Sequence, residues 1–304
     1  MPVKTLFSIW PLFAGLSLIG LAVGVQGSLL GVRAELEGFD DYLIGLLMSC
    51  YFAGFLAGSL LTPKMIQRVG HIRMFAALSA VASVTILIHA IYIEPWAWAL
   101  MRLLTGFAFS TIYVVSESWL NQASTNANRG QTLSIYTSIL LAGICAGQFM
   151  LNLANPLDFT LFILISVMVS VAAVPILLSP IETPAIEETE RVSISHLWYR
   201  TPMGVTGIVL SQWVSSILFG MGAVYGTKLG MSISEIASFM GAMMAGGMIL
   251  QWPLGKISDM VDRRWVIGFA CLFAVAFALL ISGESEASPK LYTLIFLFGG
   301  CALS

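Results

Sequence analysis

The chain has 304 residues, of which 58% are apolar and 10% are charged, and its formal net charge is −2. A soluble globular domain carries about a quarter charged residues, so this composition excludes a soluble enzyme or binding domain and indicates a protein that lies in a lipid bilayer. Its four cysteines all fall within apolar stretches and lack the spacing of metal ligands. We therefore expect neither a disulfide framework nor a metal site.

Nine apolar segments are long enough to cross a bilayer, because a spanning helix needs about 20 predominantly apolar residues. They lie at residues 9–30, 42–61, 74–93, 96–119, 133–153, 157–178, 203–225, 233–254 and 265–282. A tenth apolar segment starts near Leu291 and reaches Ser304 after 14 residues. The sequence predicts an all-α membrane protein with nine complete transmembrane helices and part of a tenth, and we interpret it as a truncated product.

The basic residues between these segments favour one orientation. With the N-terminus in the cytoplasm, ten Lys and Arg residues fall on the cytoplasmic side, and only Arg33, Lys228 and Lys290 fall outside. Lys and Arg are enriched in cytoplasmic loops, so we expect a cytoplasmic N-terminus. The longest interruption, residues 179–202, carries four glutamates and three prolines. It is interpreted as a solvated cytoplasmic linker between a six-helix bundle at 1–178 and an incomplete bundle at 203–304.

An internal repeat indicates that the two bundles are related. A shift of 192 positions aligns six residues of the first bundle with identical residues of the second. The aligned sets are Ile44, Met48, Ala53, Gly54, Lys64 and Val69 in the first bundle and Ile236, Met240, Ala245, Gly246, Lys256 and Val261 in the second. Parallel repeats of this kind are found in transporters built from two halves.

The segment LGKISDMVDRR at residues 254–264 places two acids and three bases between two apolar segments, where charge is costly. It resembles the loop signature of the major facilitator superfamily, G-x-L-x-D-x-x-G-R-R. Asp262 takes the place of the second glycine. The matching positions are Gly255, Ile257, Asp259, Arg263 and Arg264.

The equivalent loop of the first bundle, residues 63–73, keeps Arg68 and Gly70 but has Gln67 in place of the acid and Pro63 in place of the first glycine. Three segments, at residues 51–73, 102–130 and 249–264, look like the YcaD-type branch of the superfamily, a bacterial inner-membrane group. The resemblance implies a secondary transporter that moves a small organic solute by alternating access, coupled to protons. A membrane scaffold or receptor that keeps the fold without transport is the alternative, which Gln67 and the missing helices favour.

One face of the fourth segment is polar. At about 100° per residue, Arg102, Gly106, Ser110, Tyr113 and Glu117 share a face about 80° wide. Arg102 and Gly106 also resemble the superfamily's R-x-x-x-G motif, which in relatives is associated with proton coupling or with the shape of the cavity. Arg102 is either such a functional group or a snorkelling side chain with a structural hydrogen bond. Glu117 is either a clamp to a cytoplasmic arginine or a proton carrier.

The candidate residues form two sets. Those for solute binding or coupling are Arg102, Gln26, Tyr113, Gln212 and Trp213. Those for a cytoplasmic gate are Gly255, Asp259, Arg263, Arg264, Arg68, Glu117 and Arg129. By pseudo-symmetry, Asp259 is expected to face the start of the fifth segment near Arg129, unless it only neutralises the arginines of its own loop.

Other residues have structural expectations. The pairs Gly20/Gly24 and Gly143/Gly147 have a spacing that lets helices approach closely. His89 is expected at the outer interface, and His71 is expected to be a charge partner in a loop. We find no phosphate-binding loop, nucleophile elbow, zincin motif or haem signature. We therefore expect no cofactor, no enzymatic activity and no nucleic-acid partner, while the resemblance implies a small solute and protons as partners and the composition implies the lipid bilayer.

Overall fold

The computed structural model describes residues 3–125, 128–178, 198–284 and 286–303, and it describes only the backbone of residues 3–9, Met203, Asp259 and Arg263. The described chain is helical throughout, without a strand. The first six predicted segments form α1 (Val3–Leu36), α2 (Asp41–Val69), α3 (His71–Ile91), α4 (Pro95–Ala123), α5 (Arg129–Phe149) with the 3₁₀ turn η1 (Met150–Leu153), and α6 (Thr160–Ala172) with α7 (Val174–Leu177). The later segments form α9 (Pro202–Lys228), α10 (Ile233–Met260), α11 (Arg263–Ser282) and α12 (Pro289–Leu303).

The predicted spans are confirmed in number and kind. Nine helical stretches in the described residues are long and apolar enough to cross a membrane, and Pro289–Leu303 is a shorter apolar helix. The helices run further than the apolar segments do. For example, α2 continues past the predicted end at Leu61 to Val69, and the turn into α3 comes at Gly70, whose φ is 86°. A residue with a side chain is strained at such a positive φ, so the glycine fixes where this corner lies.

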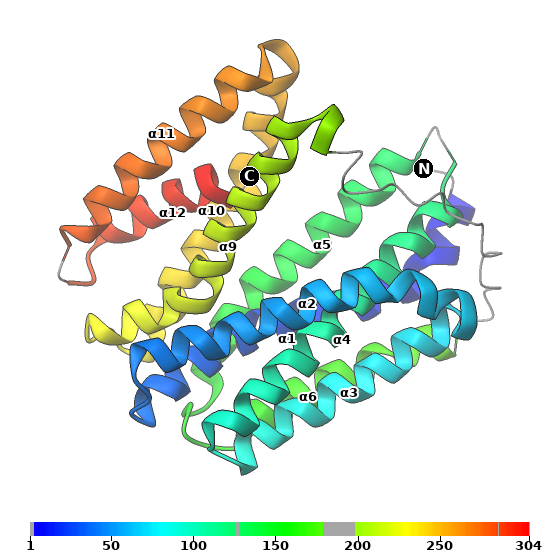
Figure 1. The fold of residues 1–304 in the computed structure, drawn as a ribbon, viewed down its shortest axis with the longest axis horizontal. Coiled ribbons are helices and arrows are strands. Elements are labelled where there is room, and N and C mark those ends of the chain that lie inside the picture. The colour runs from blue at the N-terminus through cyan, green and yellow to red at the C-terminus, as the bar shows by residue number, and fades with distance from the viewer. Residues whose placement is uncertain (1–2, 126–127, 179–197, 285, 304) are drawn as a thin grey trace.

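The helices pack as two groups, α1 to α7 and α9 to α12, which we call the first and second halves (Figure 1). Within the first group α1 packs on α5 and α6, and α4 packs between α2 and α3. Within the second group α10 packs on α12, which also contacts α11. The groups touch where α1 meets α9 and where α5 meets α10. We call the side of the molecule with the start of α1 and the α2–α3 and α10–α11 connections the N-terminal face, and the opposite side the far face.

Small residues let α1 and α5 approach closely, as their spacing predicts. A Cβ added at Gly20 would overlap the backbone of Leu140 and Gly143, and one at Gly147 would overlap the carbonyl oxygen of Leu21. Such close approach of backbones is what drives helix association where lipid removes the hydrophobic effect between helices. The two glycine pairs therefore hold α5 against α1. More than half of the residues in the apolar window of α1 are buried.

The internal repeat is visible in how the helices cross. Gly54 of α2 lies against the carbonyl group of Leu103 in α4, and Gly106 of α4 lies against that of Tyr51 in α2. In the second half the same reciprocal contact joins α10 and α12. There, Gly246 lies against Phe296, and Gly299 lies against Met243. Gly54 and Gly246 are one of the aligned pairs, so the sequence repeat corresponds to a repeated helix crossing.

Candidate functional site

The close contacts between the two halves lie near the far face, within the residues that the structure describes. Gly31 of α1 lies against Gly220 of α9, and Met48 of α2 reaches the same glycine. On the other side of this seam, Cys145 Sγ of α5 lies 3.5 Å from the carbonyl oxygen of Gly241 in α10. Each of these residues belongs to the far-face half of its helix, so the halves are joined at that end.

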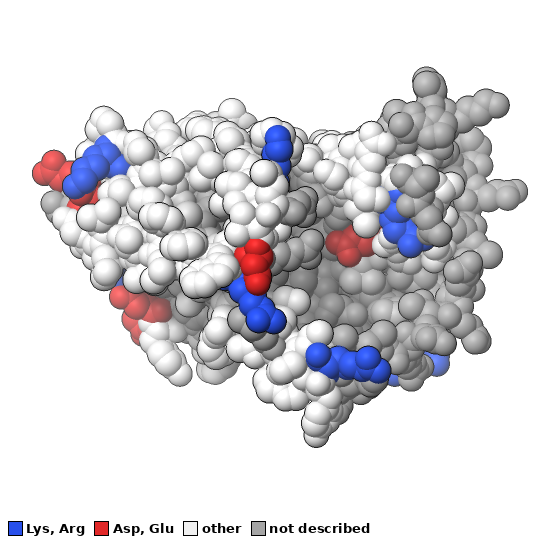
Figure 2. Space-filling view, turned by 90° about the horizontal axis from the view of Figure 1, so that it is seen from above, with Lys and Arg blue, Asp and Glu red and all other residues white. Residues whose placement is uncertain are grey.

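Two further observations support this arrangement. The side chains of Lys228, at the end of α9, and Asp41, at the start of α2, form an exposed ion pair across the seam at the far face. Residues 206–214, in the N-terminal-face half of α9, are all exposed. Viewed from above, most of the described surface is uncharged, and its Lys, Arg, Asp and Glu side chains appear in a few separate places (Figure 2). The described contacts between the halves named above thus lie at the far face, whereas the N-terminal-face half of α9 is exposed.

Arg102 lies inside the first half with 5% of its surface exposed. Its guanidinium carbon is 4.5 Å from the ring centroid of Tyr51, and its Nη2 donates to Met48 Sδ at 3.3 Å. Its Nε has no partner, and no carboxylate of a described residue lies within ion-pair distance. An arginine near the middle of a membrane helix costs about 2.5–3.5 kcal/mol, and a desolvated cation–π contact returns about 2 kcal/mol. The structure thus places Arg102 inside the first half, packed on Tyr51, and its role in coupling or solute binding stays a prediction.

A row of aromatic rings leads from Arg102 toward the N-terminal face. The centroids of Tyr51 and Phe55 are 6.1 Å apart, and those of Phe55 and Tyr113 are 6.0 Å apart. All three rings are half-buried. Ring pairs at these separations attract each other. Tyr113, predicted to share a face with Arg102, is thus connected to it through two side chains of α2.

The polar face of α4 is divided between two environments. Gly106 and Ser110 both pack against α2, and Ser110 Oγ is buried without a hydrogen-bond partner in the described part of the chain. Glu117 is exposed and accepts a hydrogen bond of 3.1 Å from the Tyr136 hydroxyl group of α5. Among the described side chains, Glu117 forms no ion pair with an arginine, so the expected clamp stays a prediction.

The three other solute-binding candidates differ in how exposed they are. Gln26 of α1 is buried, and its Nε2 has no hydrogen-bond partner among the described residues. Gln212 and Trp213 lie on the exposed stretch of α9, and Trp213 is 68% exposed. A buried amide that the sequence did not single out for a specific contact, Gln148, accepts a hydrogen bond from Ser28 Oγ and ties α5 to α1.

The gate segment is more helical than a loop signature suggests. Helix α10 continues through Gly255 to Met260, and α11 begins at Arg263, so only two residues connect them. Asp262 is the N-cap of α11, and its carboxylate accepts a hydrogen bond of 2.9 Å from the Arg264 backbone N–H. An aspartate in this position satisfies a free amide of the first turn, which explains how it replaces a glycine of the signature.

The remaining gate residues stay apart. Arg68, Arg129 and Arg264 are exposed, and Gly255 has open space around its Cα within the described residues. Asn128 precedes α5 without a side-chain cap to the helix. The side chains of Asp259 and Arg263 lie outside the described residues, so the expected approach of Asp259 to the start of α5 remains a prediction.

Both histidines of the first half are buried, in contrast to their expected interfacial and loop positions. His71, the first residue of α3, has its Nε2 3.1 Å from Ser118 Oγ and packs against the ring of Trp119. His89 has its Nδ1 2.8 Å from the Thr85 carbonyl oxygen and lies edge-on to Trp98. Helix α3 packs on α4, and this contact removes both rings from solvent. Sequence periodicity could not reveal that contact.

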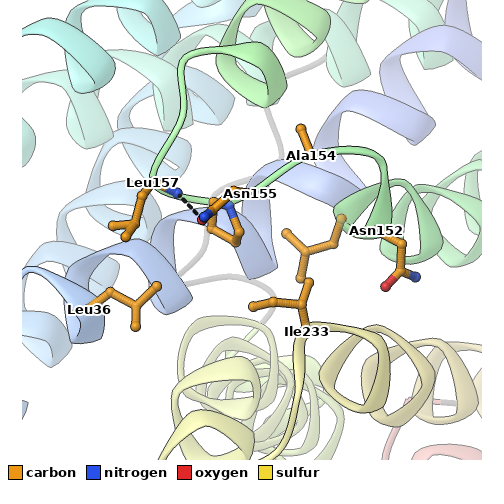
Figure 3. A pocket seen from close by; sticks show the side chains of 8 residues that line it. Leu36, Asn152, Ala154, Asn155, Leu157 and Ile233 are labelled. Carbon is orange, nitrogen blue, oxygen red and sulfur yellow. Dashed lines mark hydrogen bonds between the residues drawn. The ribbon is translucent and has the colours of Figure 1, made fainter.

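A cavity of about 470 Å³ lies on the seam at the far face (Figure 3). Leu36 and Leu157 come from the first half and Ile233 from the second, and Asn152 and Asn155 add amide groups. Arg33 fixes this region, because its Nη1 donates to the carbonyl oxygens of Pro156 and Leu157 and its Nε pairs with Glu37 at 2.6 Å. The sequence indicated only that Arg33 lies on the non-cytoplasmic side of the membrane.

Comparison with known families agrees with this geometry. Residues 11–304 match the Major Facilitator Superfamily. The chain belongs to this superfamily. It is thus a multi-pass membrane protein of a transporter family, as its loop signature predicts.

Bacterial members of the superfamily resemble it along most of its length. An uncharacterized MFS-type transporter of Enterobacter sp. (strain 638) is 28% identical over 285 residues, which cover 93% of this chain and 75% of the relative. The uncharacterized MFS-type transporter YcaD of Escherichia fergusonii is 27% identical over the same shares. The resemblance to the YcaD-type branch is therefore confirmed.

Solved superfamily structures share the fold at low identity. An inward-facing, unoccupied bacterial homolog of the human lysosomal transporter Spinster has a TM-score of 0.79 at 13% identity, covering all of this chain and 73% of that one. The D-xylose-proton symporter has a TM-score of 0.73 at 15% identity, covering 98% of this chain and 79% of that one. At this identity the likeness concerns the fold alone.

Proposed function

We propose that the protein is a secondary transporter that carries a small organic solute by alternating access, coupled to protons, in the bacterial inner membrane. The observation that carries this proposal is the asymmetry of the seam. Close contacts join the halves near the far face, where Gly31 lies against Gly220, and the N-terminal-face half of α9 is exposed. A seam closed at one end and open at the other is one of the two states that alternating access requires.

The two moving bodies in this proposal are residues 1–178 and 203–304, joined by the linker at 179–202. The N-terminus and the N-terminal face are cytoplasmic, in line with the ten-to-three distribution of basic residues and the positive-inside rule. The described state then opens to the cytoplasm. Contacts in the far-face half break when the protein opens outward.

The roles of the candidate residues follow from their positions. Arg102, Tyr113 and Gln26 supply the first half of the solute path, and Gln212 and Trp213 supply the second. Glu117, exposed on the same helix as Arg102, is the candidate proton carrier. The residues Gly255, Asp259, Arg263, Arg264, Arg68 and Arg129 form the cytoplasmic gate when the N-terminal face closes, and a carboxylate at the start of α5 would be favoured by about 0.3–1 kcal/mol there.

Distances between the halves test this proposal without knowledge of the solute. Spin labels at Asp41 and Lys228 report on the far face, and labels at the repeat-related Lys64 and Lys256 report on the N-terminal face. We expect two populations at each pair, with the far-face distance long when the other is short. Labels on Lys64 and on Trp96, an exposed residue at the start of α4 in the first half, should give a single distance. A single distance at both inter-half pairs would instead support the non-transporting scaffold.

A further inference from the structure

We propose that the solute of this transporter carries a single carboxylate, and that this group binds to the guanidinium of Arg102. The inference rests on the proposed transport function and names the chemical class of the cargo. It starts from the contrast between the two buried arginines of the first half, Arg33 and Arg102.

Arg33 shows how this fold satisfies a buried guanidinium when its role is structural. Its Nε pairs with the carboxylate of Glu37, and its Nη1 donates to two backbone carbonyl oxygens, those of Pro156 and Leu157. The protein therefore supplies both a negative charge and hydrogen-bond acceptors for the guanidinium of Arg33. A buried charge with such partners needs no ligand.

Arg102 has neither kind of partner. A guanidinium has five N–H donors in a rigid planar fork. Here the only described hydrogen-bond acceptor is the thioether sulfur of Met48, which is a weak one, and Nε is left without any. The guanidinium carbon lies 4.5 Å from the centroid of the Tyr51 ring, but this ring is not an acceptor for the in-plane N–H groups of the guanidinium. Among the described residues, no oxygen acceptor is therefore hydrogen-bonded to the guanidinium of Arg102.

The groups that face Arg102 from its neighbouring helices do not supply a negative charge. Helix α2 contributes Met48, Cys50 and Tyr51, and α3 contributes His89. The Nδ1 of His89 lies 2.8 Å from the Thr85 carbonyl oxygen and so carries the proton, which leaves Nε2 as a bare, unpartnered lone pair. None of these groups is a carboxylate, so within the described residues Arg102 lacks an anionic partner, and in this proposal the solute supplies it.

The surroundings also limit what the anion can be. A planar guanidinium fork matches a carboxylate through two parallel hydrogen bonds. Arg102 is the only Lys or Arg among the buried residues whose charge is unpaired in the described chain, which favours one negative charge rather than two. The adjoining half-buried rings of Tyr51, Phe55 and Tyr113 suit a flat or apolar body attached to that carboxylate.

Met48 is the residue that must move for the anion to bind. Its sulfur contacts Arg102 Nη2, and its side chain also lies against Gly220 of α9. A methionine side chain is flexible and adapts to new neighbours. Because Met48 contacts both Arg102 and the second half, an anion that binds Arg102 displaces a side chain that takes part in the contact between the halves.

Equilibrium binding to the purified full chain tests the inference. The probes are benzoate, its neutral isostere benzamide, and benzylammonium, with inorganic phosphate and benzenesulfonate as other oxyanions. We expect benzoate to bind the wild-type chain and the neutral and cationic probes not to. We also expect phosphate and benzenesulfonate to bind at least tenfold more weakly than benzoate. Arg102→Lys keeps the charge but loses the fork, so it should weaken benzoate binding at least tenfold, and Arg102→Gln should abolish it.

Arg33→Gln is the matched control, because it removes the other buried guanidinium of the first half. It should lower thermal stability and leave benzoate affinity within twofold of wild type. If Arg102→Gln does not fold, benzoate binding is measured on the Lys variant instead. It is also measured on Met48→Leu, which keeps the volume of the side chain but removes the sulfur. Equal benzoate binding by wild type and Arg102→Lys would overturn the inference, and so would the absence of benzoate binding to wild type. Since binding needs no conformational cycle, these results are independent of the distances that test transport.

Discussion

Arg33 and Arg102 illustrate how much a residue's meaning depends on its partners. Both are arginines of the first half with less than a tenth of their surface exposed. Arg33 joins the end of α1 to the connection between α5 and α6 through Pro156 and Leu157. It therefore supports the lining of the cavity at the far face, whereas Arg102 presents an unsatisfied donor to the interior.

The structural role of Arg33 leads to a stability prediction. Arg33→Gln should lower the free energy of unfolding by about 2 kcal/mol, since hydrogen bonds that involve a charged group contribute about 1.5–3 kcal/mol. Lys290→Gln, which breaks the exposed pair with Glu284, should change stability little, because exposed ion pairs contribute little. Denaturant unfolding of the purified variants in detergent measures both. Similar losses for the two variants would contradict the role assigned to Arg33.

At the scale of the elements, the fold depends on pairs of helices whose backbones touch. The crossing of α2 with α4 and that of α10 with α12 each rest on two glycines. Each of these crossings requires glycine, because an added methyl group would meet a carbonyl group of the partner helix.

Substitution of these glycines tests the crossing directly. Gly54→Ala and Gly246→Ala should each destabilise the protein by about 1–3 kcal/mol, the range for inserting atoms into a packed interior. Gly45, also in α2, has no described atom within 4 Å of an added Cβ. Gly45→Ala should therefore be neutral or stabilising, since alanine favours a helix by up to about 1 kcal/mol over glycine. Thermal unfolding of the three variants compares them, and equal effects at Gly45 and Gly54 would refute the packing argument.

The sequence predicted the helices well because hydrocarbon imposes a length and an apolar composition on each span. It was less informative about where they end, since α2 and α10 remain helical through their charged ends. It also placed His71 and His89 at surfaces, although contacts with α4 bury both. Contacts between distant segments determine burial, and periodicity within one helix does not contain them.

The candidate site was predictable only in outline. The shared face of Arg102 and Tyr113 follows from helix geometry, and the rings that connect them come from α2. The sequence did not indicate that Tyr136, on another helix, would donate a hydrogen bond to Glu117. Spacing along α4 gives direction around the helix axis but not the identity of the residues opposite.

For the whole molecule, the contacts near the far face define one conformation of a seam between two related halves. The cavity at that end, lined from both halves by Leu36, Leu157 and Ile233, belongs to the same seam (Figure 3). Alternating access requires a second conformation in which these contacts part and the N-terminal face closes. The central claim is therefore that the interior is reachable from each side of the membrane in turn.

The most direct measurement is the reactivity of a cysteine at Trp213, in a variant without the four native cysteines, toward an impermeant thiol reagent. The reagent is applied separately to right-side-out and inside-out vesicles, with a cysteine at Gly255 as the control for the N-terminal face. We predict that the Trp213 position reacts from both sides, faster from the N-terminal face, while the Gly255 position reacts from that face alone. Reaction of the Trp213 position from one side only would contradict alternating access.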